Sequence, residues 1–221
     1  MAAQGFPDTK LLAKAGKAAL GAIAQSQAQT TDGRCQKLQG VAYETFVREL
    51  YPNCMGRLVA RRINNMFPNC SFSDRVDLDR AFKSLAQQSK SCAMMVLKTW
   101  LNGWATSTRY HEPVIHSCLW GCPGGLPDAT AHYISCPRLW KSIQAAIKEI
   151  VPNDPLDRLA LVNATDANLR NLCVAYHAYH TFKLEYLDEV LDCRARSDTP
   201  RLAALSKRVV RASAGFVQVA S

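Results

Sequence analysis

Apolar residues recur every three or four positions along most of this chain, a spacing typical of helices that bury one face. The pattern predicts helices over residues 10–23, 41–50, 55–67, 74–88, 91–107, 138–151, 154–162 and 164–192, with a further one after residue 200. Prolines at 52, 68 and 152 interrupt the pattern, because the residue before a proline leaves helical space. The sequence therefore predicts a mainly α-helical protein.

Polar residues and apolar stripes set the expected helix boundaries. Ser73 or Asp74 is expected to cap the helix at 74–88, and Thr165 or Asp166 the long helix that follows. The apolar stripe of residues 138–151 includes Ile150, which predicts a buried side chain.

The stretch 91–107 is apolar on nearly every side, so it is expected to be the most buried element. Trp100 and Trp104 lie four residues apart and would share one helical face. Core packing is the favoured interpretation of this pair, and a platform for stacking nucleobases is the alternative.

The balance of charge points to an acidic partner. The 221 residues carry a formal net charge of +9, which favours nucleic acid first and an acidic membrane surface second. No apolar run approaches the ~18–20 residues that a membrane-spanning helix needs. Because the 9 cysteines are odd in number and mostly scattered, a reducing compartment is expected. This predicts a nuclear or cytoplasmic protein that does not use a membrane, with an organellar location left open.

Composition divides the chain into three parts. Residues 1–40 form an arm and linker, residues 41–192 a helical body, and residues 193–221 a basic C-terminal helix or tail. The arm is expected to pack on the body as an amphipathic helix. An organelle-targeting peptide and a phosphate-gripping basic arm are its alternatives.

Two basic segments are candidate nucleic-acid contacts. Arg57, Arg61 and Arg62 share a face of the helix at 55–67, where arginines four apart can straddle neighbouring phosphates. The alternative is a solvated face partly paired with Asp74, Asp77 or Asp79. The densest positive segment is C-terminal, where one acid, Asp198, accompanies the candidate contact residues Arg201, Lys207, Arg208 and Arg211. A solvated surface helix is the competing interpretation of that segment.

The chemistry of the chain is concentrated at residues 116–140. Cys118, Cys122, His132 and Cys136 follow the pattern C-x3-C-x9-H-x3-C. Thiolate and imidazole are the ligands that zinc prefers, and a closed structural zinc site uses four of them. Gly121 and the Pro-Gly-Gly run after Cys122 permit the tight turn that such a ligand pair needs. The sequence therefore predicts a small Cys3His zinc lobe that organises the helical body.

Other interpretations of this pattern stay open. The cysteines could form two disulfides or serve as buried apolar thiols. His116 or His111 could replace one ligand. With four protein ligands the zinc would be structural, because no position remains for a reactive water.

A second set of similar residues lies on the long helix. Cys173, His177 and His180 fall at i, i+4 and i+7, and so on one helical face. They could form a second metal site or part of a catalytic Cys–His pair. Without an evident fourth ligand or an orienting acid, ordinary packed or hydrogen-bonded side chains are the favoured interpretation.

Residues 75–190 resemble the zinc-binding region that lies C-terminal to the polymerase domain of non-LTR retrotransposon reverse transcriptases. The resemblance is carried by TWLNGWATSTRYHEP, the cysteine pair, Asp128, His132 and Cys136-Pro137. It implies a retroelement-derived fragment that binds nucleic acid. The Tyr-x-Asp-Asp setting of the polymerase is absent, and no acidic set with a well-placed lysine suggests a nuclease. We therefore expect a zinc-stabilised nucleic-acid-binding protein that is not an enzyme, and a structural or assembly subunit of a larger complex as the alternative.

Overall fold

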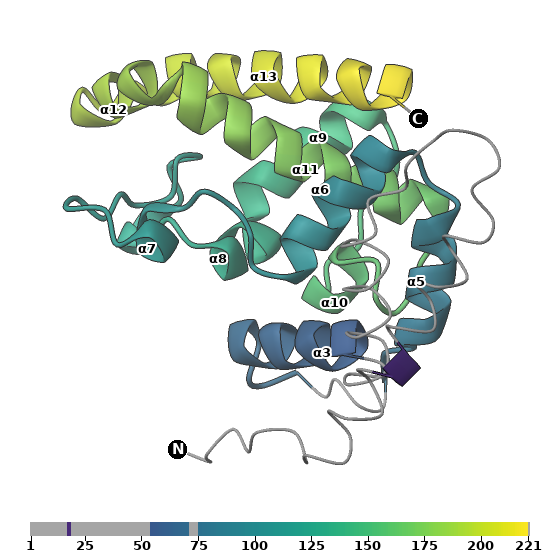
Figure 1. The fold of residues 1–221 in the computed structure, drawn as a ribbon. Coiled ribbons are helices and arrows are strands. Elements are labelled where there is room, and N and C mark those ends of the chain that lie inside the picture. The colour runs from purple at the N-terminus through teal and green to yellow at the C-terminus, as the bar shows by residue number, and fades with distance from the viewer. Residues whose placement is uncertain (1–16, 19–53, 71–74, 221) are drawn as a thin grey trace, which may run out of the picture. The chain divides into compact units, whose positions relative to one another are not determined.

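A computed structural model describes residues 17–18, 54–70 and 75–220 of the chain (Figure 1). The chain divides into two compact units, Met1–Arg57 and Leu58–Ser221. The described helices of four residues or more are α3 (Cys54–Met66), α5 (Leu78–Ala86), α6 (Lys90–Trp100), α7 (Ser107–Tyr110), α8 (Thr130–Ser135), α9 (Pro137–Ile147), α10 (Pro155–Arg158), α11 (Asp166–Glu185), α12 (Leu187–Ala195) and α13 (Thr199–Ala220). Among these residues no strand forms, so the mainly α prediction is confirmed. None of the described helices is both long and apolar enough to cross a membrane.

The helix starts follow ordinary capping chemistry. The side chains of Asp77, Ser89 and Thr165 each accept a hydrogen bond from a first-turn backbone N–H, which satisfies donors that the helix itself leaves unpaired. Thr165 was one of the two expected caps. The helix expected from residue 74 instead begins at Leu78, with Asp77 as its cap, and Ser73 and Asp74 lie outside the described residues. The expected helices at 10–23 and 41–50 are also outside the described part, apart from residues 17–18.

Several expected helix ends were wrong, among them the following three. The helix predicted over 91–107 ends at Trp100, and the one predicted over 164–192 breaks at Tyr186 into α11 and α12. The third, α9, ends at Ile147 because Lys148 adopts a left-handed conformation with φ of 60°. The chain therefore leaves the helical path before Ile150, whose side chain is 90% exposed rather than buried.

The centre of the second unit is α11, which packs against α6, α9 and α13. In Figure 1, α13 runs along α11 at one edge of this group. The apolar core contains Leu172, Ala175, Tyr179 and Phe182 of α11, all of them fully buried. A helix so enclosed buries residues on more than one face, so its apolar residues are not confined to a single stripe. About half of its residues are buried, which is close to the share in α6, the element expected to be the most buried.

Trp100 and Trp104 are both fully buried, which confirms core packing and excludes a base-stacking role. The Trp100 indole N–H donates to the Leu159 carbonyl at 2.8 Å, and the Trp104 indole N–H donates to the Thr99 hydroxyl at 2.9 Å. Buried indoles normally pair their single donor in this way.

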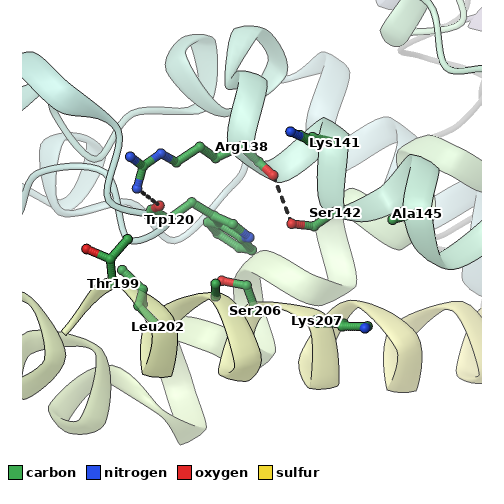
Figure 2. Close-up of a pocket in the computed structure, with 10 residues that line it drawn as sticks. Trp120, Arg138, Lys141, Ser142, Ala145, Thr199, Leu202, Ser206 and Lys207 are labelled. Atoms are coloured by element: carbon green, nitrogen blue, oxygen red, sulfur yellow. Dashed lines mark hydrogen bonds between the residues drawn. The ribbon is translucent and has the colours of Figure 1, made fainter.

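The basic C-terminal segment is a 22-residue helix that belongs to the second unit. Its apolar side chains Leu202, Leu205, Val209 and Val210 are buried, and α13 contacts α9, α11 and α12. Between α13 and α9 lies a groove over the side chain of Trp120 (Figure 2).

Candidate metal centre

The first two cysteines lie on a short hairpin-like loop. An isolated antiparallel bridge joins Ser117 to Pro127, and the Cys118 N–H donates to the Leu126 carbonyl at 2.8 Å. Gly121, with φ of 69°, turns the chain between the two cysteines. This backbone angle favours glycine, and a Cβ atom at this position would also lie 2.9 Å from Cδ2 of Leu202, so that side chain would have to shift.

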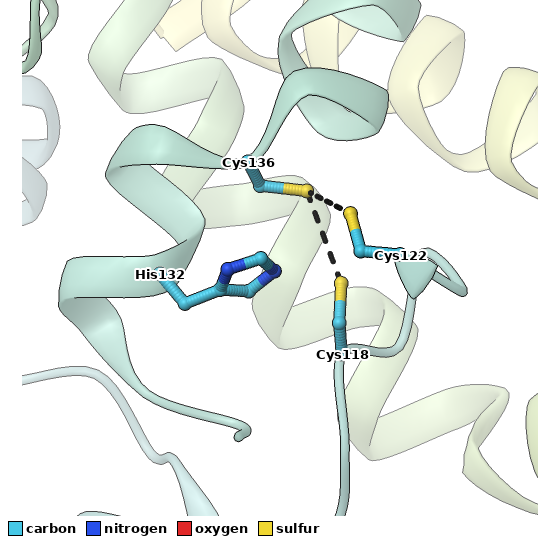
Figure 3. A group of neighbouring side chains, drawn as sticks. All are labelled: Cys118, Cys122, His132 and Cys136. Atoms are coloured by element: carbon cyan, nitrogen blue, oxygen red, sulfur yellow. Dashed lines mark hydrogen bonds between the residues drawn. The ribbon is translucent and has the colours of Figure 1, made fainter. Parts of the chain in front are cut away.

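The other two ligand candidates flank the end of α8. His132 lies within this helix, and Cys136 ends it while its sulfur accepts a 3.4 Å hydrogen bond from the Leu139 N–H at the start of α9. A chain that leaves one helix and enters the next at Cys136 can direct His132 and Cys136 toward the same point. Figure 3 shows their side chains facing those of Cys118 and Cys122.

The four donor atoms of Cys118, Cys122, His132 and Cys136 all lie within 4.8 Å of one another. The Cys136 sulfur is 3.8 Å from the Cys118 sulfur and 3.4 Å from the Cys122 sulfur. Four ligands placed tetrahedrally at a zinc–sulfur distance of ~2.3 Å would have sulfurs about 3.8 Å apart. The cluster thus has the size of a tetrahedral metal site, and its donors could hold one metal ion.

The imidazole of His132 gives independent support. Its Nε2 atom is buried and has no hydrogen-bond partner among the described residues. Buried polar atoms are normally paired, because an unpaired one loses its hydration without compensation. A metal ion held between this ring nitrogen and the three thiols would account for the missing partner.

The thiols interact strongly with one another. The hydrogen bond from Cys136 is the main reason that the pKa of Cys118 falls to about 4, and His132 lowers it further. The same contact with Cys118 raises the pKa of Cys136. Burial raises the pKa of Cys122. One sulfur therefore carries negative charge readily, while the other two release their protons only to a cation that takes their place.

The alternatives to a metal cluster fit the geometry less well. Cys136 approaches two sulfurs at once, which a pair of separate disulfides would not produce, and all the cysteines of the cluster are free thiols. His116 lies outside the group, with its Nε2 3.9 Å from the Glu112 carboxylate. His111 is also outside the group and is exposed at the end of α7.

A buried carboxylate stands beside the cluster, and the sequence reasoning missed its role. Asp128 is fully buried and accepts hydrogen bonds from the Ser107 N–H at 2.6 Å and from the hydroxyls of Tyr133 and Tyr179 at 2.7 and 3.0 Å. The Lys183 ammonium lies 3.2 Å away. Since Tyr133 follows His132 directly, this network fixes the ligand-bearing helix α8 against α11. From the sequence, Asp128 was expected as a part of the motif shared with the retrotransposon zinc region, with no role in supporting α8.

Charge balance in this network favours the ionised carboxylate. Burial alone would raise the pKa of Asp128, but the hydrogen bonds from Ser107 and Tyr133 and the positive charge of Lys183 together lower it. Burial and the neighbouring Asp128 raise the pKa of both Tyr133 and Tyr179, so these hydroxyls remain donors. The carboxylate thus has a full set of partners, as a buried charge requires.

The second Cys/His set does not converge. The Cys173 sulfur faces that of Cys92 at 2.7 Å, and His177 Nδ1 lies 3.0 Å from the Ser213 hydroxyl. His180 accepts from the Ala105 N–H and lies 2.8 Å from the Tyr176 carbonyl. Burial lowers the pKa of both histidines. Packed, hydrogen-bonded side chains are therefore the correct interpretation, and among the described residues no second group of donors comes together.

The predicted basic residues of α3 are on the surface. Arg57, Arg61 and Arg62 are all exposed. Of the acids expected to pair with them, Asp74 is outside the described residues. Asp77 instead caps α5, and no ion pair joins it to Arg61 or Arg62 in the part of the chain that is described.

The basic residues of α13 fall into two groups. Arg201 lies 3.2 Å from Glu189 and 3.5 Å from Asp192, and Arg208 lies 3.8 Å from Glu189 and covers the ring of Tyr186. These acids of α12 come near α13 only because the chain turns back at Ser197, so counting Asp198 alone underestimated the acids near the segment. Lys207 and Arg211 are exposed and have no ion-pair or hydrogen-bond partner among the described residues.

No known family model, curated protein or solved structure matches this chain.

Proposed function

We propose that the protein is a zinc-stabilised nucleic-acid-binding module without catalytic activity of its own. The Cys3His donor set and the sulfur separations of 3.8 and 3.4 Å suit zinc. All four tetrahedral positions would come from the protein, so the ion would have no place for an activated water. Zinc would instead hold the loop at 117–127 against the ends of α8 and α9.

The observation that carries the nucleic-acid proposal is the unpaired positive surface of α13. Lys207 and Arg211 are four residues apart, exposed and without a partner among the described residues, and Lys141 of α9 shares these properties. Exposed cations that no acid neutralises are free to exchange counterions for phosphates, which drives sequence-independent binding. Arg201 and Arg208 contribute less on this account, because their charges already face Glu189 and Asp192.

The resemblance to the zinc region of non-LTR retrotransposon reverse transcriptases is consistent with this proposal. It rests on the stretch TWLNGWATSTRYHEP, on the four ligands with the proline after Cys136, and on Asp128 between the ligands. In this chain that aspartate lies in the network that supports the ligand-bearing helix. Retroelement origin, like a nuclear or cytoplasmic location, remains a prediction from the sequence.

Charge reversal tests the proposal directly. Lys207→Glu combined with Arg211→Glu should weaken binding to a labelled 20-nucleotide strand and to its duplex at least tenfold in fluorescence anisotropy. Contact with about four phosphates also predicts a log–log salt slope of about −3 to −4 in the wild type. Arg196→Glu is the matched control, because Arg196 is exposed and already paired with Asp192 at 2.8 Å.

The outcomes distinguish a nucleic-acid-binding protein from a structural or assembly subunit, the two functions that the sequence leaves open. Wild-type binding that falls with salt and with the double reversal supports nucleic-acid contact. Absent binding, or binding that is indifferent to the reversal, would favour the structural or assembly subunit, whose basic faces meet acidic protein surfaces. Arg61→Glu tests the contribution of α3 in the same assay.

A further inference from the structure

The groove between α9 and α13 has the character of a binding site. It has a volume of about 390 Å³, within the range that small ligands occupy. Its walls are largely apolar, with Ala145 on one side and Leu202 and Ala203 on the other, over the indole of Trp120. Figure 2 shows the Trp120 ring lying between the two helices.

Two polar side chains that line this groove make no hydrogen bond among the described residues. Trp120 is 2% exposed, and its Nε1 atom has no hydrogen-bond partner among the described residues. In Figure 2 the nitrogen end of this indole is turned toward Ser142. Ser206 is 5% exposed, and its hydroxyl takes part in none of the hydrogen bonds found in the described part of the chain. The groove therefore offers an unsatisfied donor and an adaptable hydroxyl to a ligand with a polar edge.

Cations surround the same groove. Lys141 and Lys207 line it and have no acidic partner in the described ranges, while the guanidinium of Arg138 makes only a long 3.4 Å hydrogen bond to the Trp120 carbonyl. No acidic residue lines the groove. An apolar cleft with donors inside and cations at its margin fits a ligand that joins a flat, polar-edged body to negative groups.

We propose that this groove seats one unpaired base of a single-stranded nucleic acid, with the adjoining phosphates on Lys141, Lys207 and Arg138. The inference rests on the proposed nucleic-acid function and gives it a strand preference. A base held in a duplex directs its edge to its complement and its faces to its neighbours, whereas an unpaired base can leave the stack and enter a pocket. Every base has ring or carbonyl acceptors that can take the Trp120 N–H.

The metal cluster would maintain this groove. Trp120 lies between the ligands Cys118 and Cys122, and Arg138 comes two residues after Cys136. A Cβ atom added to Gly121 would lie 2.9 Å from Cδ2 of Leu202. The loop that carries the two cysteines therefore packs closely against α13 beside the groove. The positions of Trp120 and Arg138 in the groove would therefore depend on the bound metal ion.

Base dependence is tested with the unaltered zinc-loaded protein and two probes that share a backbone. A 15-nucleotide thymidine strand should bind at least tenfold tighter than an abasic strand of equal length and charge. It should also bind at least fivefold tighter than the corresponding duplex. Equal affinities for the thymidine and abasic strands would overturn the groove proposal.

Two variants locate the effect. Ala203→Trp fills the groove without changing charge and should reduce binding of the thymidine strand at least tenfold, with abasic binding within twofold of wild type. Ala212→Trp is the matched control, because Ala212 is exposed on the same helix but does not line the groove. Ser206→Ala, a change that removes only the hydroxyl, should reduce thymidine binding about threefold to tenfold.

Circular dichroism and zinc content would verify that each variant is folded. If Ala203→Trp and Ser206→Ala both bind thymidine as the wild type does, the groove proposal fails. The function proposed above then still stands if Lys207→Glu with Arg211→Glu weakens binding. If none of these variants alters binding, both proposals fail.

Discussion

The chain contains two sets of cysteine and histidine residues that resemble metal ligands, and only one of them converges. Cys118, Cys122, His132 and Cys136 bring four donors within 4.8 Å of one another. Cys173 and His180 belong to the other set, and they contact Cys92 and the Ala105 N–H instead. The two sets differ in the local backbone structure on which their residues lie.

The converging set comes from a turn and from the junction of two helices. Gly121 reverses the chain between its cysteines, and α8 ends at Cys136 and so redirects the backbone. Donors can then approach a point from different sides, as tetrahedral coordination requires. The other set lies on a continuous helix, where residues i and i+7 are separated by about 10 Å along the axis. A shared helical face is therefore weaker evidence for a metal site than ligands separated by turns.

Removal of two ligands should have the largest effect. Cys122→Ser with Cys136→Ser should abolish metal binding, whose apparent free energy in small zinc-finger peptides is about 10–16 kcal/mol. We expect the variant to lose part of its helical circular dichroism and its cooperative thermal transition. Cys70→Ser is the control, since Cys70 is a free thiol outside the cluster. If the double variant kept its metal, Cys122 and Cys136 would not be its ligands, and the contrast between the converging and non-converging sets would fail.

Loss of the buried carboxylate should come next. Asp128→Ala removes the acceptor that Lys183, Tyr133 and Tyr179 share, while Lys183 keeps Glu112 at 2.7 Å and Tyr179 keeps the Ala105 carbonyl at 3.0 Å. We therefore expect a loss of about 2–3 kcal/mol of unfolding free energy. Urea unfolding of the metal-loaded protein measures this. The exposed Asp79→Ala should change stability by less than about 0.5 kcal/mol. A loss below about 1 kcal/mol for Asp128→Ala would mean that the metal alone positions α8.

Acid should release the metal from the converging set. Since Cys118 has a pKa of about 4 while the pKa values of Cys122 and Cys136 are raised, metal binding near pH 7 must displace two thiol protons. Protons then compete with the ion, and affinity should fall about 100-fold, or about 2.7 kcal/mol, for each unit by which the pH is lowered. Competition with a chromophoric chelator between pH 6 and 8 measures the slope. A pH-independent affinity would show that the thiols do not bind the ion.

Changes in the second set should have the smallest effect. Cys173→Ser and His180→Gln should each leave the metal content unchanged and lower the unfolding free energy by no more than about 2 kcal/mol, as expected for buried packing and hydrogen-bond losses. Metal analysis beside thermal unfolding checks both quantities. Loss of metal from either variant would mean that these residues also serve as ligands.

The sequence predicted the helical class and the ligand cluster because both depend on local spacing. Helical periodicity and a turn glycine at position 121 act over a few residues, and the structure confirms them. The role of Asp128 could not be predicted in this way, because Lys183 and Tyr179 lie 55 and 51 positions away in the chain. The signals in the sequence were the place of Asp128 in the shared motif and its position as the lone acid between the cysteine pair and His132.

Long-range folding also explains the remaining misses. Glu189 reaches Arg201 only after the turn at Ser197, so counting charges along the segment did not reveal the pair. The buried donors of the groove come from Trp120 and Ser206, which belong to segments that meet through the packing of α9 on α13. Ile150 continued an apolar stripe in the sequence but lies beyond the left-handed residue that ends α9.

Metal content of the purified protein, without added metal and beside the Cys122→Ser, Cys136→Ser variant, tests the central claim most directly. We predict one zinc ion per wild-type chain by elemental mass spectrometry and none in the variant. Replacement by cobalt should give the absorption of a tetrahedral thiolate site. A well-folded wild-type protein that contains no metal and does not take up zinc or cobalt would contradict the account.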